Sequence, residues 1–273
     1  MELGLKGRAA VVAGASKGMG RATVLRLLEE GANVAFCARS SQPLEEITEA
    51  AKGLPGRALP IKCDLAHREA ADIFVKQAVE AFGRLDIMVF APSLHLNRQF
   101  MEISDADWEE TFNITFHAGV RMARAVIPHM KAQQWGRMLF IGAGSIYKPS
   151  VGVRVAPVDV HPDFTAAKAA LTNLAKFLSK DLGADQILVN TLHPGYVLGP
   201  EKVTRIAGPE AVGATTVNEA FVEAAARIGY IPAVGRAGTP ESFANLAVFL
   251  CSEANTYVSG VEAAVDGGGL DVG

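Results

Sequence analysis

Cysteine is scarce in this chain, and the three present, Cys37, Cys63 and Cys251, lie far apart without CxxC spacing. An odd number without that spacing disfavours a disulfide framework and a zinc site, and it indicates reduced thiols in a cytosolic protein. The six histidines show no close ligand spacing either. The sequence therefore predicts neither structural disulfides nor a metal site.

An excess of charge of one sign is lacking as well. The chain has 26 Lys and Arg against 29 Asp and Glu, a net charge of −3, and its basic residues are scattered. This distribution gives no electrostatic footprint for nucleic acid. No apolar segment has membrane length, and the beginning, MELGLKGRAAVVAG, has too short an apolar run for a signal peptide. We expect a cytoplasmic protein with a small-molecule substrate and with neither a nucleic-acid nor a membrane partner.

Apolar residues, in contrast, are plentiful. The chain has 273 residues, 49% of them hydrophobic and 20% charged, which is ordinary for one α/β domain that spans residues 1–273. Apolar runs bounded by turn residues predict strands, and apolar spacings of three and four predict helices between them. After the first strand and helix, near residues 8–31, the expected strands are 33–38, 58–63, 86–91, 137–142, 187–192 and 261–265. A helix is expected to follow Pro43, and the clearest helices are 71–82, 105–133, 164–182 and 240–251. This alternation predicts a Rossmann-type, doubly wound parallel sheet with helices on both faces and a ligand at the carboxyl ends of the strands.

The stretch RAAVVAGASKGMG, residues 8–20, reads as a strand, a tight turn and the start of a helix. Gly14, Gly18 and Gly20 let the backbone turn sharply and approach a ligand, while the first free N–H groups of the helix point at an anion. A dinucleotide pyrophosphate is the natural ligand. The spacing GxxxGxG differs from the common GxGxxG fingerprint, so the turn alone is equally compatible with a simple loop.

Three other segments have features that suggest a role. Residues 143–163 form an irregular stretch rich in Val, Pro and Gly, and such a long loop inside a domain is usually functional. The connection at about residues 195–232 is interpreted as a lid over the substrate. The helix 164–182 is apolar nearly all round, which a subunit contact would explain. We therefore expect a homodimer or a homotetramer.

Several motifs together resemble the short-chain dehydrogenase/reductase family over essentially the whole chain. They are GASKGMG, Asp64 in KCDL, Asn113 in FNITF, HPGYV, and the ending GRAGTPE…FLCSEANTYVSG…VDGG. The resemblance implies hydride transfer between a bound nicotinamide and a carbonyl or alcohol. Matched motif by motif, it implies cofactor contacts from Gly14, Ser16, Lys17, Gly18, Met19, Gly20, Arg39, Asp64, Leu65, Ala91, Lys168, Pro194, Gly195 and Val197.

The residues after the second strand favour NADP(H) over NAD(H). An acidic residue there would accept hydrogen bonds from the ribose 2′-OH and repel a 2′-phosphate. In this chain the position holds Ala38, followed by Arg39, and Lys17 adds a second cation from the glycine turn. Two cations without a carboxylate indicate NADP(H).

The expected catalytic residues contain one departure from the family pattern. The family's YxxxK motif reads FTAAK here, so Phe164 occupies the position of the acid tyrosine and Lys168 that of the ribose-binding lysine. Asn113 matches the helix asparagine that supports a proton relay. Ser145 stands two residues beyond the usual serine position, which holds Ala143, and is expected to polarise the substrate, with Tyr147 as a possible helper.

Four interpretations of Phe164 stay open. Another acid could substitute, with Tyr147 and His161 as candidates. The reaction could add hydride to an activated alkene, for which the final proton can come from water. The protein could bind NADP without turnover, or the phenylalanine could be an engineered replacement that traps a complex. The sequence thus predicts an NADP(H)-dependent reductase of a small ketone, with an enoyl-type reductase or a catalytically silent NADP-binding protein as alternatives.

Overall fold

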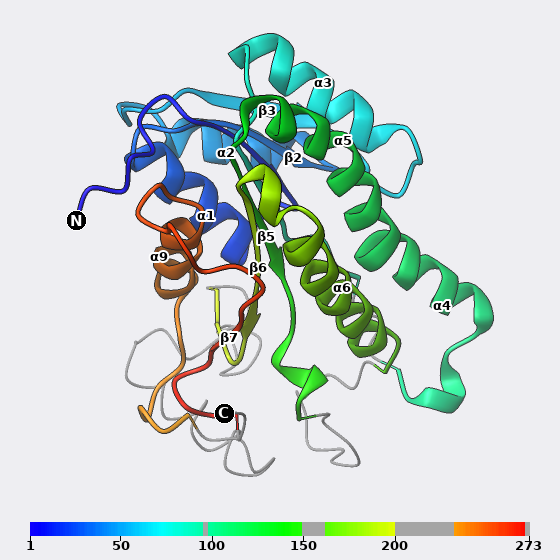
Figure 1. The fold of residues 1–273 in the computed structure, drawn as a ribbon. Coiled ribbons are helices and arrows are strands. Elements are labelled where there is room, and N and C mark those ends of the chain that lie inside the picture. The colour runs from blue at the N-terminus through cyan, green and yellow to red at the C-terminus, as the bar shows by residue number, and fades with distance from the viewer. Residues whose placement is uncertain (95–97, 149–161, 200–231, 271–273) are drawn as a thin grey trace.

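A seven-stranded parallel sheet forms the centre of the protein (Figure 1). The structure is a computed structural model that describes residues 1–94, 98–148, 162–199 and 232–270. The strand order is β3-β2-β1-β4-β5-β6-β7, and every neighbouring pair runs parallel. The strands are β1 (Ala9–Ala13), β2 (Asn33–Ala38), β3 (Ala58–Lys62), β4 (Ile87–Phe90), β5 (Gly136–Ile141), β6 (Ile187–Pro194) and β7 (Glu262–Val265). The predicted α/β fold is confirmed.

Helices cover both faces of the sheet, as Figure 1 shows. One layer contains α1 (Gly18–Glu29), α2 (Ser41–Ala50) and α9 (Pro240–Leu250). The other contains α3 (Ala70–Phe82), α4 (Asp105–Phe112), α5 (Ala118–Gln133) and α6 (Pro162–Asp181). Because both faces are covered, a central strand can be apolar along its whole length, and every residue of β1, AAVVA, is buried.

Each face has its own apolar core. Val24 and Phe243 pack on the α1/α9 face, and Phe74 and Leu171 pack on the α3/α6 face. The expected apolar face of α6 is confirmed on its inner side, whereas its Phe177 is 65% exposed. A subunit contact over that exposed side stays a prediction.

Two helices differ from the predicted boundaries. The helix expected over 105–133 is interrupted by a π-helical turn, Asn113–His117, between α4 and α5. π-helical turns are frequent at functional sites because they redirect the side chains that follow. The second helix starts at Ser41, ahead of Pro43, since the first turn of a helix needs no N–H partner and tolerates proline.

The order of the strands places a crevice beside β1. The chain runs outward from β1 to β2 and β3, then returns to form β4 on the other side of β1. The connections that leave β1 and β4 therefore diverge, which opens a space at their carboxyl ends. Ligands of doubly wound sheets bind at such a switch point.

The described part of the chain contains no helix long and apolar enough to cross a membrane. Within the same residues, no group of His, Cys, Asp or Glu could hold a metal ion. The predicted lid lies mostly in residues 200–231, outside the described residues.

Candidate functional site

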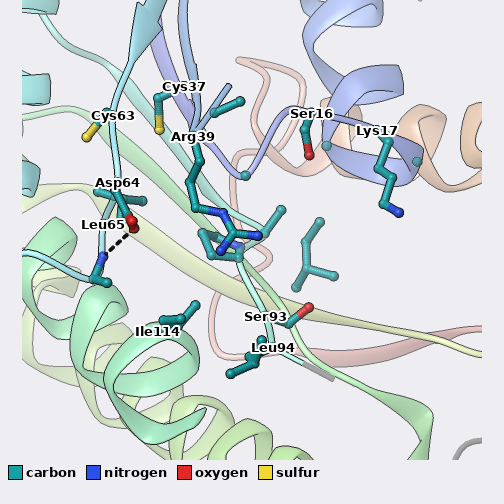
Figure 2. Close-up of a pocket in the computed structure, with 18 of the residues that line it drawn as sticks. Ser16, Lys17, Cys37, Arg39, Cys63, Asp64, Leu65, Ser93, Leu94 and Ile114 are labelled. Carbon is teal, nitrogen blue, oxygen red and sulfur yellow. Dashed lines mark hydrogen bonds between the residues drawn. The ribbon is translucent and has the colours of Figure 1, made fainter. Parts of the chain in front are cut away.

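A cavity of about 510 Å³ lies at the carboxyl ends of β1 and β4 (Figure 2). Ten residues predicted to contact a cofactor line it: Gly14, Ser16, Lys17, Gly18, Met19, Gly20, Arg39, Asp64, Leu65 and Ala91. The sequence analysis missed further lining residues at the ends of β2 to β5 and on the π-helical turn, among them Cys37, Cys63, Pro92, Ile114 and Ile141. For the residues next to strands, the position directly at a strand end was the signal that could have found them, because these ends meet at one edge of the sheet.

The glycine turn is shaped by close backbone contacts. Gly14 has φ +76°, and a Cβ there would lie 2.8 Å from the nitrogen of Pro92. A Cβ on Gly20 would lie 2.3 Å from the carbonyl oxygen of Gly14. The turn therefore needs glycine at both positions, and it holds the start of α1 against the cavity. The free N–H groups of that helix end favour an anion.

Two cations and one carboxylate surround the opening of the cavity. Figure 2 shows Arg39 extending from the end of β2 across the cavity and Lys17 at the start of α1. Asp64 Oδ1 accepts a hydrogen bond from the N–H of Ala66 at 3.0 Å, which holds the loop after β3. The cavity thus joins a helix N-terminus to two positive side chains, an arrangement suited to a ligand with several phosphate groups.

Lys168 lies beneath this cavity. Its side chain comes from α6 and is fully buried, and Nζ donates to the carbonyl oxygens of Ile141 at 2.5 Å and Pro92 at 3.4 Å. Both of these residues also line the cavity. Burial lowers the pKa of Lys168 to about 7, since the ammonium form loses its hydration. The amine can therefore hold or release a proton near neutral pH.

Ser145 and Phe164 are brought close to Lys168 by α6. Ser145 Oγ lies 3.0 Å from Oγ1 of Thr165, the residue that follows Phe164. The ring centroid of Phe164 is 5.8 Å from Nζ of Lys168, and the ring is 8% exposed. The amine of Lys168 thus faces an aromatic ring that carries no polar atom, while the hydroxyl of Ser145 contacts the neighbouring residue, Thr165.

Tyr147 belongs to a polar cluster that the sequence analysis did not detect. Its hydroxyl donates to Glu262 Oε2 at 2.6 Å, and its ring packs edge-on against His193 at 5.1 Å between centroids. His193 Nδ1 accepts from the N–H of Ala143 at 3.2 Å, and its Nε2 lies 3.9 Å from Glu262 Oε2. Burial and the Glu262 carboxylate raise the pKa of Tyr147 above its usual value, whereas burial lowers the pKa of His193. Tyr147 is therefore a weaker acid than an ordinary tyrosine.

Asn113 is held by side-chain hydrogen bonds to the loop after β3 and to α5. Its Nδ2 donates to the carbonyl oxygen of Ala66 at 2.9 Å, and its Oδ1 accepts from Arg121 at 3.0 Å. The side chain therefore ties the π-helical turn to the loop after β3, whereas the carbonyls that bind Lys168 follow β4 and end β5. The fully buried hydroxyl of this turn belongs to Thr115, whose Oγ1 accepts from the N–H of Leu94 at 3.4 Å. Residues two apart on a helix point in nearly opposite directions, so Asn113 and Thr115 face different surroundings. The role of Asn113 in a proton relay stays a prediction.

The remaining predicted residues lie at or beyond the end of β6. Pro194 pairs with Val265 of β7, and the N–H of Gly195 donates to the Val265 carbonyl at 3.1 Å. Val197 forms a bridge with Gly238. None of the three lines the cavity described above, and their cofactor contacts stay predictions. His161 lies outside the described residues.

Comparison with known proteins gives consistent matches. A family model described as enoyl-(acyl carrier protein) reductase matches residues 14–269. L-sorbose reductase from Gluconobacter frateurii, solved with NADPH and L-sorbose, superposes with a TM-score of 0.87 at 30% identity over 100% of both chains. An L-rhamnose 1-dehydrogenase (NAD(P)(+)) of a Sphingomonas species is 30% identical over 97% of this chain and 96% of its own. A 3-oxoacyl-[acyl-carrier-protein] reductase of Thermotoga maritima is 27% identical over 97% of this chain and 98% of its own.

These matches extend over nearly the whole chain. The family model covers nearly the whole chain, and the relatives align with it almost end to end. The chain belongs to the short-chain dehydrogenase/reductase family of oxidoreductases.

Proposed function

We propose that the protein is an NADP(H)-dependent reductase that transfers hydride to a small carbonyl substrate. The observation that carries this proposal is the cavity at the β1/β4 switch point, whose lining residues Pro92 and Ile141 bind the buried amine of Lys168. The bound nicotinamide would supply the hydride. The proposal extends to one domain over residues 1–273, with a substrate lid at about 195–232.

The lining residues fit an NADP(H) molecule. A Cβ at Gly14 or Gly20 would clash with the backbone of the turn next to α1. Because both residues are glycine, the turn can stay tight, and the first N–H groups of α1 can face a pyrophosphate. Arg39 and Lys17 lie where a 2′-phosphate needs positive charge, and Ala38, at the end of β2, carries no carboxylate to repel it. Lys168 would hold the nicotinamide ribose from below.

The residues near Lys168 suggest how a carbonyl is handled. Ser145 would donate a hydrogen bond to the substrate oxygen, and Thr165 holds its hydroxyl in place. Tyr147 would form a wall rather than an acid, because its proton is engaged by Glu262. Burial lowers the pKa of Lys168 to about 7, so its ammonium group could supply a proton to the substrate at neutral pH.

Reduction of an activated C=C bond is the second candidate. Phe164 gives no hydroxyl at the position of the family's acid tyrosine, and alkene reduction can take its last proton from water. The description of the matching family model, an enoyl reductase, is in line with this alternative.

A single-turnover assay tests both candidates. Purified protein loaded with NADPH is mixed with ketoses such as L-sorbose, with a 3-oxoacyl thioester and with a conjugated enone, and the loss of nicotinamide absorbance is followed. Faster oxidation with a ketone than without substrate supports carbonyl reduction, and oxidation with the enone alone supports alkene reduction. Tight NADPH binding without oxidation over the whole panel would leave the silent binding protein as the function.

Replacing Arg39 with alanine is expected to weaken NADPH binding about tenfold to a hundredfold and to leave NADH binding unchanged. The arginine would make a charge-assisted bond to the 2′-phosphate, a group that NADH lacks. Calorimetric titration of both cofactors measures the effect. Arg57→Ala serves as the matched control. Arg57 is exposed, lies outside the cavity and donates a hydrogen bond to the Ala81 carbonyl. Equal loss for both cofactors, or none, would refute the assignment of Arg39 to the 2′-phosphate.

A further inference from the structure

Two of the three cysteines meet at one edge of the cavity. Cys37 lies in β2 opposite Ile61 of β3, and the N–H of Cys63, just beyond β3, donates to the Ala38 carbonyl at 3.0 Å. The ladder therefore continues to Cys63, which has the same side-chain direction as Ile61 and hence as Cys37. Both side chains belong to the core on the α3 face of the sheet. Figure 2 shows the two thiols side by side at the upper edge of the cavity.

The two thiols differ in exposure and in how easily they ionise. A hydrogen bond between them lowers the pKa of Cys63 and, together with burial, raises the pKa of Cys37. Cys63 is half-buried, whereas Cys37 is 1% exposed. The accessible thiol is thus also the one that ionises more easily, and the thiolate is the form that oxidants attack. Cys63 has the properties of an attacking cysteine and Cys37 those of a resolving partner.

We infer that Cys37 and Cys63 form a reversible disulfide when the protein meets a peroxide, and that this bond weakens cofactor binding. The inference rests on the proposed NADP(H) function. Cys63 would displace water from hydrogen peroxide and become a sulfenic acid. Cys37 would then attack that sulfur, lose its proton and release a second water. Two thiols and one peroxide give one disulfide and two waters, and a dithiol reductant reverses the oxidation.

The disulfide would act directly on the cavity wall. Cys63 lies two residues beyond Ile61, the register partner of Cys37, so the two Cα atoms are offset by about 6.6 Å along the strands in addition to the strand spacing. A disulfide holds its Cα atoms within about 7 Å, so its formation would shift the ends of β2 and β3 relative to each other. Arg39 and Asp64 follow the two cysteines closely and line the same cavity. Their displacement would disturb the end of the cavity assigned to the 2′-phosphate and adenine.

Disulfide formation and NADPH binding must affect each other reciprocally. If the disulfide weakens NADPH binding by some factor, bound NADPH opposes disulfide formation by the same factor. Bound cofactor would also cover Cys63 from the side of the cavity. NADPH should therefore protect both thiols from peroxide.

The test begins with NADPH affinity of the reduced protein, followed by stepwise treatment with hydrogen peroxide, thiol counting and mass mapping of the disulfide. Expected results are a Cys37–Cys63 bond, an NADPH affinity about tenfold weaker, and full recovery with dithiothreitol. Cys37→Ser and Cys63→Ser, each compared with its own reduced state, should lose the reversible response. Cys251→Ser should keep it, because Cys251 is fully buried and burial raises its pKa to about 12.

Three outcomes would overturn the inference. One is that mapping finds no bond between Cys37 and Cys63 after oxidation. Another is that the bond forms while NADPH affinity stays unchanged. The third is that NADPH binding by Cys63→Ser remains as sensitive to peroxide as that of the parent. A reduced protein that never binds NADPH would instead contradict the proposed function, and disulfide mapping would still report on the cysteine pair.

Discussion

Replacing Phe164 with tyrosine is expected to raise the single-turnover rate of NADPH oxidation with a ketone by about 10²–10⁴, the usual contribution of a positioned general acid. The ring of Phe164 lies 5.8 Å from Nζ of Lys168, and the next residue, Thr165, contacts Ser145. A hydroxyl on this ring would thus be added close to the amine of Lys168. The nearby ammonium would also lower the pKa of the new tyrosine.

Two further variants separate acid catalysis from changed packing. Phe164→Leu keeps an apolar side chain without a hydroxyl and should react no faster than the parent. Phe164→Tyr combined with Lys168→Met should lose most of the gain, because the two groups are expected to act as a unit. Rates are compared at saturating NADPH, so that weaker cofactor binding in a variant does not lower its measured rate.

An equal rate for Phe164→Tyr and the parent would mean that the proton comes from elsewhere. Tyr147→Phe then becomes the next variant to measure. A tenfold or greater fall in that variant would assign the proton to Tyr147 despite its bond to Glu262. No fall would leave His161, Lys168 or water as the source.

Replacing Gly14 with alanine is expected to abolish measurable NADPH binding and to lower the free energy of unfolding by about 2–4 kcal/mol. The residue has φ +76°, and its new Cβ would lie 2.8 Å from the nitrogen of Pro92. Backbone strain and a backbone clash therefore act together, and relief of the clash would move the turn that faces the cavity. Denaturant unfolding and NADPH titration measure the two effects.

Gly7 provides the matched control for backbone strain. It has φ +79°, nothing lies within 4 Å of its added Cβ, and it precedes β1 at the opposite edge of the sheet from the cavity. Gly7→Ala should cost only about 1 kcal/mol and leave NADPH affinity unchanged. If Gly14→Ala behaves like Gly7→Ala in both measurements, the close contact between the glycine turn and Pro92 is not important for the site.

The sequence alone determined the order of the elements and ten of the residues that line the cavity. Alternating apolar runs predicted all seven strands, because strand and helix periods are local properties that the sequence displays directly. The residues of the glycine turn and of the β2 and β3 ends were also found, since their motifs place them at carboxyl ends that the topology brings together. Lys168 was predicted from its motif, and its burial followed from the apolar helix around it.

Only the tertiary structure decided which distant side chains meet. The direction of Asn113 depends on a π-helical turn, and no local pattern in FNITF predicts that extra residue in the turn. The contact of Tyr147 with Glu262 and His193 joins segments more than 40 residues apart. Cys37 and Cys63 come from neighbouring strands, and only the strand register places their side chains on the same face. Such pairs depend on strand register and helix rotation, which are fixed when the whole core packs and which cannot be obtained from the spacing of residues along the chain.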